Sequence, residues 1–271
     1  LLIVGGAGFL GYYLTKSVLH WNLNNSIRDQ INLTVLDNFS RGMPAFLSEL
    51  NENADLKIIE HDITHPLKTE LGDFQFILHA ASIASPTYYR QHPVETMDAN
   101  VIGLRQLLDY CLNQKKGRKE NVEGLLFFST SEIYGDPPNE FIPTPEDYKG
   151  NVSCTGPRAC YDESKRFGET LCVNFANQYE LPIKIARPFN NYGPGLKISD
   201  KRVLPDFAKN ILFDQDIILH SDGKPSRTFC YIADAIVGYF KILVNGRPGE
   251  AYNIGVESPE ISMLSLAKKI K

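Results

Sequence analysis

The sequence predicts an α/β fold in which a doubly wound parallel sheet is followed by a smaller C-terminal lobe. Short apolar runs alternate with stretches of helical period, a glycine-rich turn joins the first run to the first helix, and the alternation ends after Pro188. Strands that alternate with helices pair in parallel and place helices on both faces of their sheet. A chain of 271 residues is long enough to bury such a core.

The expected strands are short and rich in Val, Ile, Leu and Phe, which is typical of strands buried on both faces. They cover residues 1–4, 32–36, 56–60, 74–79, 124–129 and 183–186. The helices between them are expected at residues 9–21, 94–113 and 160–178. The polar stretch 114–123 predicts a solvated loop between a helix and a strand.

After Pro188 the pattern changes, because Gly193, Pro194 and Gly195 interrupt the chain. The elements expected beyond this point are helices at 203–213 and 233–244, strands at 217–220 and 228–232, a segment at 252–255 and an amphipathic helix at 264–271. We expect a lobe over the carboxyl ends of the strands, where sheets of this kind hold their ligands.

The composition excludes several classes of protein. A net charge of −4 disfavours a nucleic-acid or anionic-membrane partner, and no apolar run reaches the ~18–20 residues of a membrane helix. The five cysteines lack a C-x-x-C pair and the six histidines lack ligand spacing. We therefore expect reduced thiols, a cytoplasmic protein and no metal site. Both chain ends look cut, and a targeting or membrane segment before residue 1 stays open.

A glycine-rich turn directly follows the first expected strand and opens the first helix. Gly5, Gly8 and Gly11 fit the pattern G-x-x-G-x-x-G, and Gly6, Gly8 and Gly11 fit G-x-G-x-x-G. Glycines let the backbone turn tightly and approach a pyrophosphate, which the helix amino terminus then binds. In this strand–turn–helix context the motif predicts a dinucleotide-binding Rossmann domain.

Acidic residues after the next two strands define the predicted cofactor. Asp37 follows the second strand, where a carboxylate accepts hydrogen bonds from the adenosine ribose hydroxyls. A 2′-phosphate there would meet a like charge, so we predict NAD rather than NADP. Asp62 and Ile63, at the end of the third strand, are predicted adenine contacts. The further predicted cofactor contacts are Phe9, Leu10, Asn38, Ala80, Ala81 and Asn100.

These predictions divide the chain into two parts. Residues 1–188 are expected to form the NAD-binding Rossmann domain. Residues 189–271 are expected to form mainly a substrate-binding lobe, partly interleaved with that domain.

The start of the third expected helix carries a candidate catalytic pair. Tyr161 and Lys165 form the pattern Y-x-x-x-K, and residues four apart share one helix face. A neighbouring ammonium and the positive nicotinamide favour the phenolate, so we expect them to lower the pKa of Tyr161. The phenol can then take the proton from a sugar hydroxyl while hydride leaves its carbon for NAD. Thr130, just after the fifth strand, is expected to bring a hydroxyl beside the phenol. Tyr161 and Lys165 are also predicted cofactor contacts.

Together these motifs resemble the extended short-chain dehydrogenases that process nucleotide sugars, also called the NAD-dependent epimerase/dehydratase family. The resemblance spans essentially the whole chain and is strongest toward the UDP-glucuronate decarboxylases. The segments that carry it are 84–86, 129–137, 156–166 and 226–229.

One triplet distinguishes the members of this family. Dehydratases carry Thr-Asp-Glu where this chain has Thr130, Ser131 and Glu132, and their Asp is the acid that helps to expel water. Ser131 offers no such acid. Loss of CO₂ from a β-keto acid needs only the ketone as electron sink, so the triplet favours decarboxylation.

The resemblance also implies roles for individual residues. Tyr161, Lys165 and Thr130 would oxidise the sugar at C4, and a water or acid held near Glu132 would protonate C5 after CO₂ has left. The implied substrate contacts are Ser85, Tyr89, Asn190, Arg202 and Arg227. A homodimer through the helices at 94–113 and 160–178 is also implied.

Some residues depart from the decarboxylase pattern, and other functions stay open. The decarboxylases usually have Gly where this chain has Lys201 and Val-Ser where it has Leu204 and Pro205, and Pro is common at the position of Ile83. The nucleotide and the exact sugar therefore stay open. The alternatives are a 4,6-dehydratase or 4-epimerase of nucleotide sugars and a non-catalytic NAD-binding regulator. Intact catalytic side chains argue against the regulator.

Overall fold

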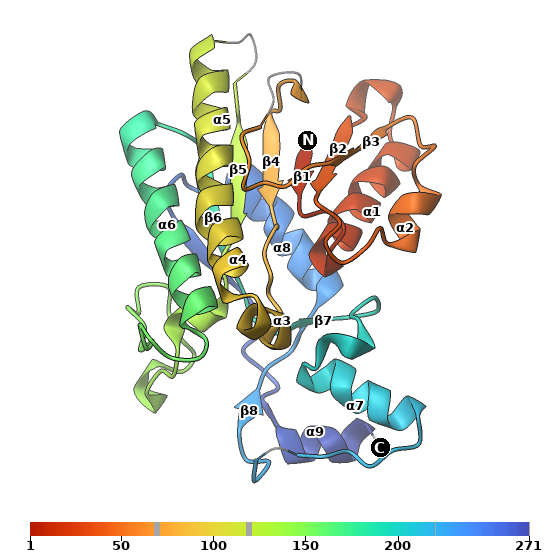
Figure 1. Cartoon of the computed structure of the whole chain (residues 1–271), viewed down its shortest axis with the longest axis vertical. Coiled ribbons are helices and arrows are strands. Elements are labelled where there is room, and N and C mark those ends of the chain that lie inside the picture. The colour runs from red at the N-terminus through yellow and green to blue at the C-terminus, as the bar shows by residue number, and fades with distance from the viewer. Residues whose placement is uncertain (68–70, 118–120, 220, 271) are drawn as a thin grey trace.

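The computed structural model describes residues 1–67, 71–117, 121–219 and 221–270. Within this part of the chain a seven-stranded sheet has the order β10-β6-β5-β4-β1-β2-β3, and each of its neighbouring strands pairs in parallel (Figure 1). The strands are β1 (Leu2–Val4), β2 (Leu33–Asp37), β3 (Leu56–Glu60), β4 (Phe76–His79), β5 (Gly124–Phe128), β6 (Ile183–Pro188) and β10 (Ala251–Ile254). The order reverses between β1 and β4, and a crevice for a ligand opens at such a point. The predicted doubly wound fold is confirmed.

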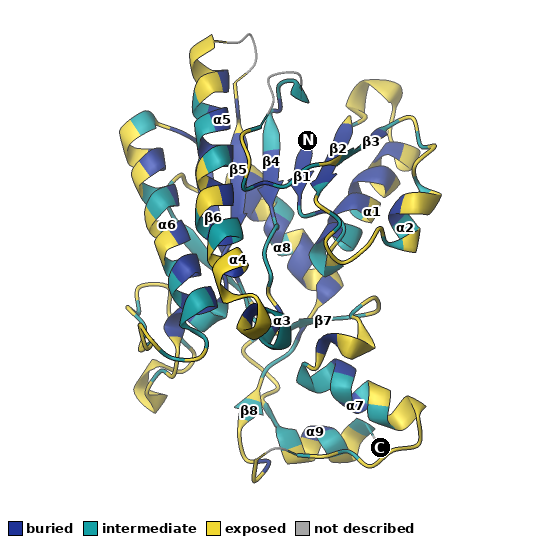
Figure 2. Ribbon diagram, viewed as in Figure 1, coloured by how far each residue is buried: buried dark blue, intermediate teal, exposed yellow. Residues whose placement is uncertain are grey.

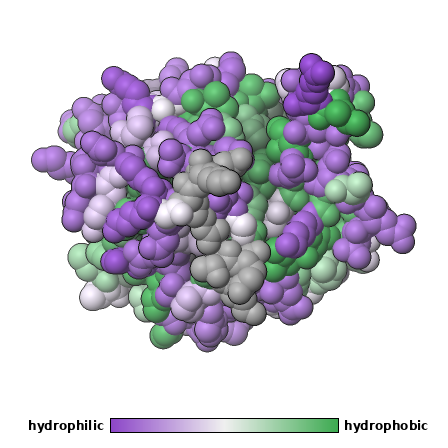
Figure 3. Space-filling view, turned by 90° about the horizontal axis from the view of Figure 1, so that it is seen from above, coloured by the Kyte–Doolittle hydropathy of each residue, from purple (hydrophilic) through white to green (hydrophobic). Residues whose placement is uncertain are grey.

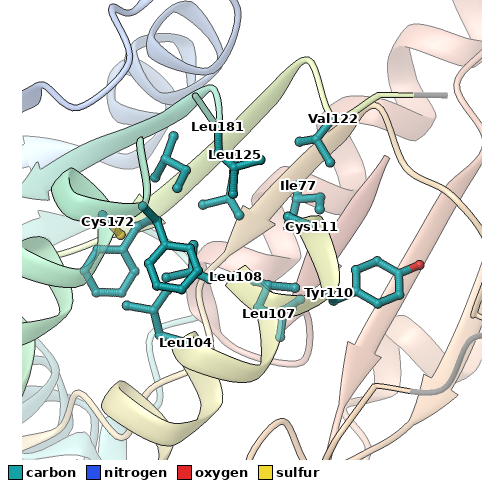
Figure 4. Packing of buried hydrophobic residues seen from close by; sticks show 14 of the residues in the cluster. Ile77, Leu104, Leu107, Leu108, Tyr110, Cys111, Val122, Leu125, Cys172 and Leu181 are labelled. Carbon is teal, nitrogen blue, oxygen red and sulfur yellow. The ribbon is translucent and has the colours of Figure 1, made fainter. Parts of the chain in front are cut away.

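Helices cover both faces of the sheet and bury two apolar clusters against it. On one face lie α5 (Leu104–Gly117) and α6 (Ala159–Tyr179), and on the other lie α1 (Phe9–Asn24) and α8 (Ile232–Asn245). Helical period explains the first cluster, because Leu104, Leu107, Leu108 and Cys111 point from α5 onto the sheet (Figure 4). Full burial of one leucine stabilises the fold by about 1.5–3 kcal/mol. Figure 2 shows the same helices buried toward the sheet and exposed on their outer sides.

The helix predicted at 94–113 is interrupted and extends further than expected. A short α4 (Pro93–Asp98) leads through a π-helical turn (Ala99–Gly103) into α5. The loop predicted at 114–123 is wrong for its first four residues, because α5 runs to Gly117. Gln114 is buried, and its amide donates to the Phe74 carbonyl (3.0 Å) and accepts from the Phe74 N–H (3.3 Å). The polar side chain of Gln114 is therefore buried because the backbone of Phe74 satisfies its hydrogen bonds. Residues 118–120 of the predicted loop are not among the described residues.

The C-terminal third divides between the sheet and the lobe. The chain returns to the sheet with α8 and β10, so the two parts are interleaved. The lobe holds α7 (Val203–Leu212), α9 (Met263–Ile270) and two small sheets, which pair β7 (Asn191–Tyr192) with β9 (Cys230–Tyr231) and β8 (Ser226–Arg227) with β11 (Ile261–Ser262). In Figure 1 it lies beyond the carboxyl ends of the strands. The boundary at residue 188 stays a prediction.

Two predicted lobe strands need correction. The strand predicted at 217–220 is wrong for residues 217–219, which have no regular structure, and residue 220 lies outside the described residues. Ile218 is 62% exposed, and its neighbours Ile217 and Leu219 are only partly buried. The strand predicted at 228–232 is reduced to β9. Two short helices escaped prediction, α2 (Ala45–Glu49) and α3 (Pro86–Gln91).

The opposite end of the molecule, where β4 and β5 begin, is largely hydrophilic with scattered apolar areas (Figure 3). Among the described helices, none combines the length and apolar character that crossing a membrane requires.

Candidate active site

A cleft of about 800 Å³ opens at the carboxyl edge of the sheet. It is lined by the glycine turn, by the residues after β2, β3 and β4, and by residues 194–197, 200 and 202 of the lobe. The predicted cofactor residues that line it are Gly5, Gly8, Phe9, Asp37, Asn38, Asp62, Ile63, Ala80 and Ala81. Leu10, Gly11 and Asn100 do not line it, and neither do Tyr161 and Lys165.

Two glycines of the turn are required by close backbone contacts, whereas a Cβ atom on a third would make one ordinary van der Waals contact. Gly5 has φ +84°, and a Cβ atom there would lie 2.4 Å from the Ala81 backbone N. On Gly11 it would lie 2.3 Å from the Gly6 carbonyl oxygen. On Gly8 the nearest described atom outside its chain neighbours would be 3.6 Å away. The turn thus packs tightly behind and leaves room in front, as a pyrophosphate needs.

Asp37 fixes the shape of this turn. Its Oδ2 accepts the Ala7 N–H and its Oδ1 accepts the Phe39 N–H, both at 2.9 Å. Burial raises the pKa of Asp37, and these backbone hydrogen bonds oppose the rise. Each carboxylate oxygen keeps a second lone pair for a ribose hydroxyl. Asp37 therefore joins the end of β2 to the glycine turn and still faces the cleft.

The predicted adenine contact Asp62 lies next to the predicted contact Asn38. Partial burial of Asp62 opposes ionisation, but hydrogen bonds from the Thr64 backbone and hydroxyl and from Asn38 hold its pKa below the usual range. Asn38 Nδ2 donates to Asp62 Oδ2 at 3.2 Å. The loops after β2 and β3 are thereby tied together at the cleft.

Asn100 lies behind the wall of the cleft. It is fully buried in the π-helical turn, where its Nδ2 donates to Ser164 Oγ (2.8 Å) and its Oδ1 accepts from Ser82 Oγ (2.7 Å). Asn100 thus links the loop after β4 to the helix that carries Tyr161. A π-helical turn often marks a functional site.

The structure brings the predicted catalytic side chains together. Tyr161 and Lys165 are both buried on the first turns of α6. The Thr130 hydroxyl hydrogen-bonds the Tyr161 phenol. Lys165 Nζ donates to the Phe128 carbonyl at 2.8 Å and lies 6.0 Å from the centre of the Tyr161 ring. The carboxyl end of β5 therefore meets α6 at this site.

The pKa values of this pair differ from the expectation. Burial raises the pKa of Tyr161 to about 12, although the Thr130 hydrogen bond and the charge of Arg202 oppose the rise. Burial also lowers the pKa of Lys165 to about 7. The expected lowering of the phenol pKa by the neighbouring ammonium is therefore not seen, because burial dominates, and the lowering by the positive nicotinamide stays a prediction.

Glu132 forms an ion pair that the sequence did not reveal. Its carboxylate binds the Arg158 guanidinium, which also lies 3.5 Å from Asp162 Oδ2 through Nε. Glu132 follows β5, while Arg158 and Asp162 stand at the start of α6. In the sequence, only the spacing of Arg158 and Asp162, which lie four residues apart, indicates that these two side chains can pair.

Two of the five predicted substrate contacts, Ser85 and Arg202, line the cleft. Both contact the buried Asp200: Ser85 Oγ donates to its carbonyl (3.2 Å), and Arg202 Nε donates to its Oδ2 (2.6 Å). Arg41, which also lines the cleft, reaches Asp200 at 3.9 Å and covers the Tyr88 ring at 4.6 Å.

The other three predicted substrate contacts do not line the cleft. Tyr89 stacks on Tyr161. Asn190 donates to the Thr228 carbonyl at 3.0 Å, and Arg227 is exposed. The lining does not include either of them.

The comparisons with known proteins now decide the family. Residues 1–255 match the NAD dependent epimerase/dehydratase family. The chain belongs to this family. The predicted family and the NAD cofactor are therefore confirmed, and the glycine turn, Asp37 and Asp62 fit the cofactor.

Relatives of this epimerase/dehydratase chain include UDP-glucuronic acid decarboxylase 5 of Arabidopsis thaliana, 36% identical over the whole chain and 73% of the relative. UDP-glucuronic acid decarboxylase 1 of Xenopus tropicalis is 35% identical over the whole chain and 59% of the relative. The DesIV dTDP-glucose 4,6-dehydratase of Streptomyces venezuelae, solved with NAD bound, has a TM-score of 0.83 at 24% identity and matches 99% of this chain and 79% of its own. It confirms the fold.

Proposed function

We propose that this enzyme converts a UDP-linked glucuronate to a UDP-linked pentose with NAD that is regenerated in each cycle. The observation that carries the proposal is the turn after β5, where Thr130 bonds the Tyr161 phenol and Ser131 stands in place of an acid. The decarboxylases of plants and frog, 35–36% identical over the whole chain, support it.

The first step is oxidation at the sugar C4. NAD, when bound, accepts the C4 hydride and later returns it. Tyr161 takes the proton of the C4 hydroxyl, and the Thr130 hydroxyl holds the phenol in position. Arg202, whose charge lowers the pKa of Tyr161 against the effect of burial, stabilises the phenolate. Lys165 is fixed behind the phenol by the Phe128 carbonyl.

The second step is loss of CO₂. The C4 ketone is β to the sugar carboxylate, so the C5–carboxylate bond breaks and its electron pair moves into an enolate. The hydroxyls of Thr130 and Tyr161 stabilise the C4 oxygen of this enolate. Ser131 supplies no acid to a departing C6 hydroxyl, so dehydration of a neutral sugar is disfavoured. Protonation at C5 and return of the hydride and proton at C4 complete the cycle.

The substrate diphosphate binds where the lobe meets the cleft. Arg202 lines the cleft and presents a planar fork of donors that suits phosphate oxygens. Arg227 is exposed on β8, from where the long side chain adds a second guanidinium.

We also propose that the protein forms a homodimer through α4, the π-helical turn and α6. Their outer sides expose Val94 (57%), Ile102 (43%) and Phe167 (49%). Exposed apolar side chains that gather on neighbouring helices are typical of a subunit contact.

The five cysteines are free thiols, which fits a reducing compartment such as the cytoplasm.

The test is incubation with UDP-glucuronate and NAD, followed by mass spectrometry of the nucleotide sugar and measurement of CO₂. We expect a UDP-pentose, stoichiometric CO₂ and deuterium at C5 when the reaction runs in D₂O. UDP-glucose and dTDP-glucose serve as matched substrates without a carboxylate. A 4-keto-6-deoxy product from either, with no CO₂ from the glucuronate, would overturn the proposal in favour of a dehydratase.

A further inference from the structure

Arg158 connects two carboxylates beside the reacting phenol. One guanidinium nitrogen binds Glu132, while Nε lies 3.5 Å from Asp162 Oδ2. Asp162 directly follows Tyr161 in α6, and the Thr130 hydroxyl that bonds Tyr161 also accepts the Glu132 N–H at 3.2 Å. Arg158 therefore determines where the Glu132 carboxylate lies relative to the phenol.

The same cluster contains three buried polar atoms that lack a hydrogen-bond partner within the described part of the chain. They are the Tyr89 hydroxyl, Arg158 Nε and Asp162 Oδ1. The three side chains are near neighbours, because Tyr89 stacks on Tyr161, which directly precedes Asp162 in α6, and Arg158 Nε lies 3.5 Å from Asp162 Oδ2. A buried polar atom that lacks a hydrogen bond destabilises the folded protein unless a bound ligand supplies the partner. Three of them in one cluster indicate a bound polar ligand.

The chemistry of these atoms favours water over an anion. Arg158 Nε–H can only donate, an ionised Asp162 Oδ1 can only accept, and the Tyr89 hydroxyl can do both. A water molecule matches this mixture, and buried waters have two to four such partners. The positive charge of Arg158 already faces two carboxylates, Glu132 and Asp162, so a third carboxylate would be repelled.

We propose that Arg158 is the positioning residue for Glu132 and that Arg158, Tyr89 and Asp162 hold the water that protonates C5. The inference rests on the proposed function. The held water gives a proton to C5 of the enolate and is left as hydroxide, which a solvent proton converts back to water. This balance matches the one proton consumed when a carboxylate leaves as CO₂ and hydrogen takes its place.

The experiment measures how the products divide after CO₂ has left. Wild type, Arg158→Met, Arg158→Lys, Asp162→Asn and Tyr89→Phe are each given UDP-glucuronate and NAD. CO₂ release and the ratio of released 4-keto pentose to pentose are followed together. We expect Arg158→Met to raise that ratio about tenfold or more while CO₂ release falls less. Arg158→Lys should lie between, because lysine keeps the charge and lacks the fork of donors.

Controls separate this role from a merely structural one. Arg247→Met removes an exposed ion pair with Glu250 and should leave the ratio unchanged. An unchanged ratio in folded Arg158→Met would overturn the assignment. If that variant does not fold, an unchanged ratio in both Asp162→Asn and Tyr89→Phe does so. Absence of CO₂ from the wild type would instead contradict the proposed function, and this assignment with it.

Discussion

The rings of Tyr89 and Tyr161 lie stacked, with centroids 5.1 Å apart and planes inclined by only 7°. Tyr89 comes from α3 in the loop region after β4, and Tyr161 comes from the first turn of α6. Both side chains are buried. An aromatic pair of this kind adds about 0.5–1.5 kcal/mol beyond the area it buries. The stack therefore fixes the plane in which the phenol presents its oxygen to the substrate.

Loss of this stack should slow the oxidation step. We expect Tyr89→Leu to lower the rate of the first hydride transfer about tenfold to a hundredfold, because a poorly oriented phenol accepts the proton less well. Tyr89→Phe keeps the ring and should retain most of that rate. Rapid mixing with UDP-glucuronate, followed by the absorbance of the reduced cofactor, measures the step. Equal rates for the two variants would show that stacking does not orient Tyr161.

Removal of the phenol oxygen should abolish turnover. Tyr161→Phe keeps the stack on Tyr89 but loses the proton acceptor, and a general base typically contributes ~10²–10⁴-fold to rate. NAD affinity, measured by calorimetry, should change little, since Tyr161 does not line the cleft. A variant with near-wild-type turnover would remove Tyr161 from the mechanism.

Asp37 should set the preference for NAD over NADP. Asp37→Asn removes the negative charge that faces a 2′-phosphate and keeps an oxygen for the Ala7 N–H, although it loses the acceptor of the Phe39 N–H, whereas Asp37→Ala loses both acceptors. Two unit charges at ~4 Å interact by about 1 kcal/mol in water and by more near a protein surface. We therefore expect the preference to fall about tenfold or more in Asp37→Asn. Calorimetry with both cofactors checks this, and an unchanged ratio of affinities would contradict it.

Much of the fold was predictable because its signals are local. Each strand of the Rossmann sheet up to β6 is an apolar run, and the glycine turn lies where strand and helix must meet. The run at 217–219 misled the prediction because it finds no strand partner in the described structure. The π-helical turn was invisible for another reason: its extra residue serves the contacts of buried Asn100, which no period reveals.

The candidate site was predictable where a motif places two groups on one element. Tyr161 and Lys165 share a helix face, and Asp37 follows a strand. The pairing of Glu132 with Arg158 joins residues 26 apart and depends on how the turn after β5 meets α6. The pKa values depend on burial, which spacing does not give.

His79 should make the stability of the protein sensitive to acid. It ends β4, is 1% exposed, and its ring nitrogens find no hydrogen-bond partner among the described residues. Burial, and then the charge of Lys165, lower the pKa of His79 from 6.5 to about 3. The folded protein therefore keeps this ring neutral while the unfolded chain protonates it. Above pH 6.5 the burial of His79 does not lower the free energy of unfolding. As the pH falls from 6.5 toward 3, the free energy of unfolding decreases progressively.

His79→Phe tests this directly, because phenylalanine fills a similar volume beside Phe127, leaves no nitrogen unpaired and does not titrate. The measured quantity is the free energy of unfolding of the variant minus that of the wild type. This difference should be larger near pH 5 than at pH 7.5 by on the order of 2 kcal/mol, since each pKa unit is about 1.4 kcal/mol. Lys165, with a pKa of about 7, titrates largely above this window, so its contribution is nearly the same in both proteins. Urea unfolding midpoints at the two pH values measure the effect. If wild type and His79→Phe lose stability in parallel as the pH falls, the buried histidine is not the source of the acid sensitivity.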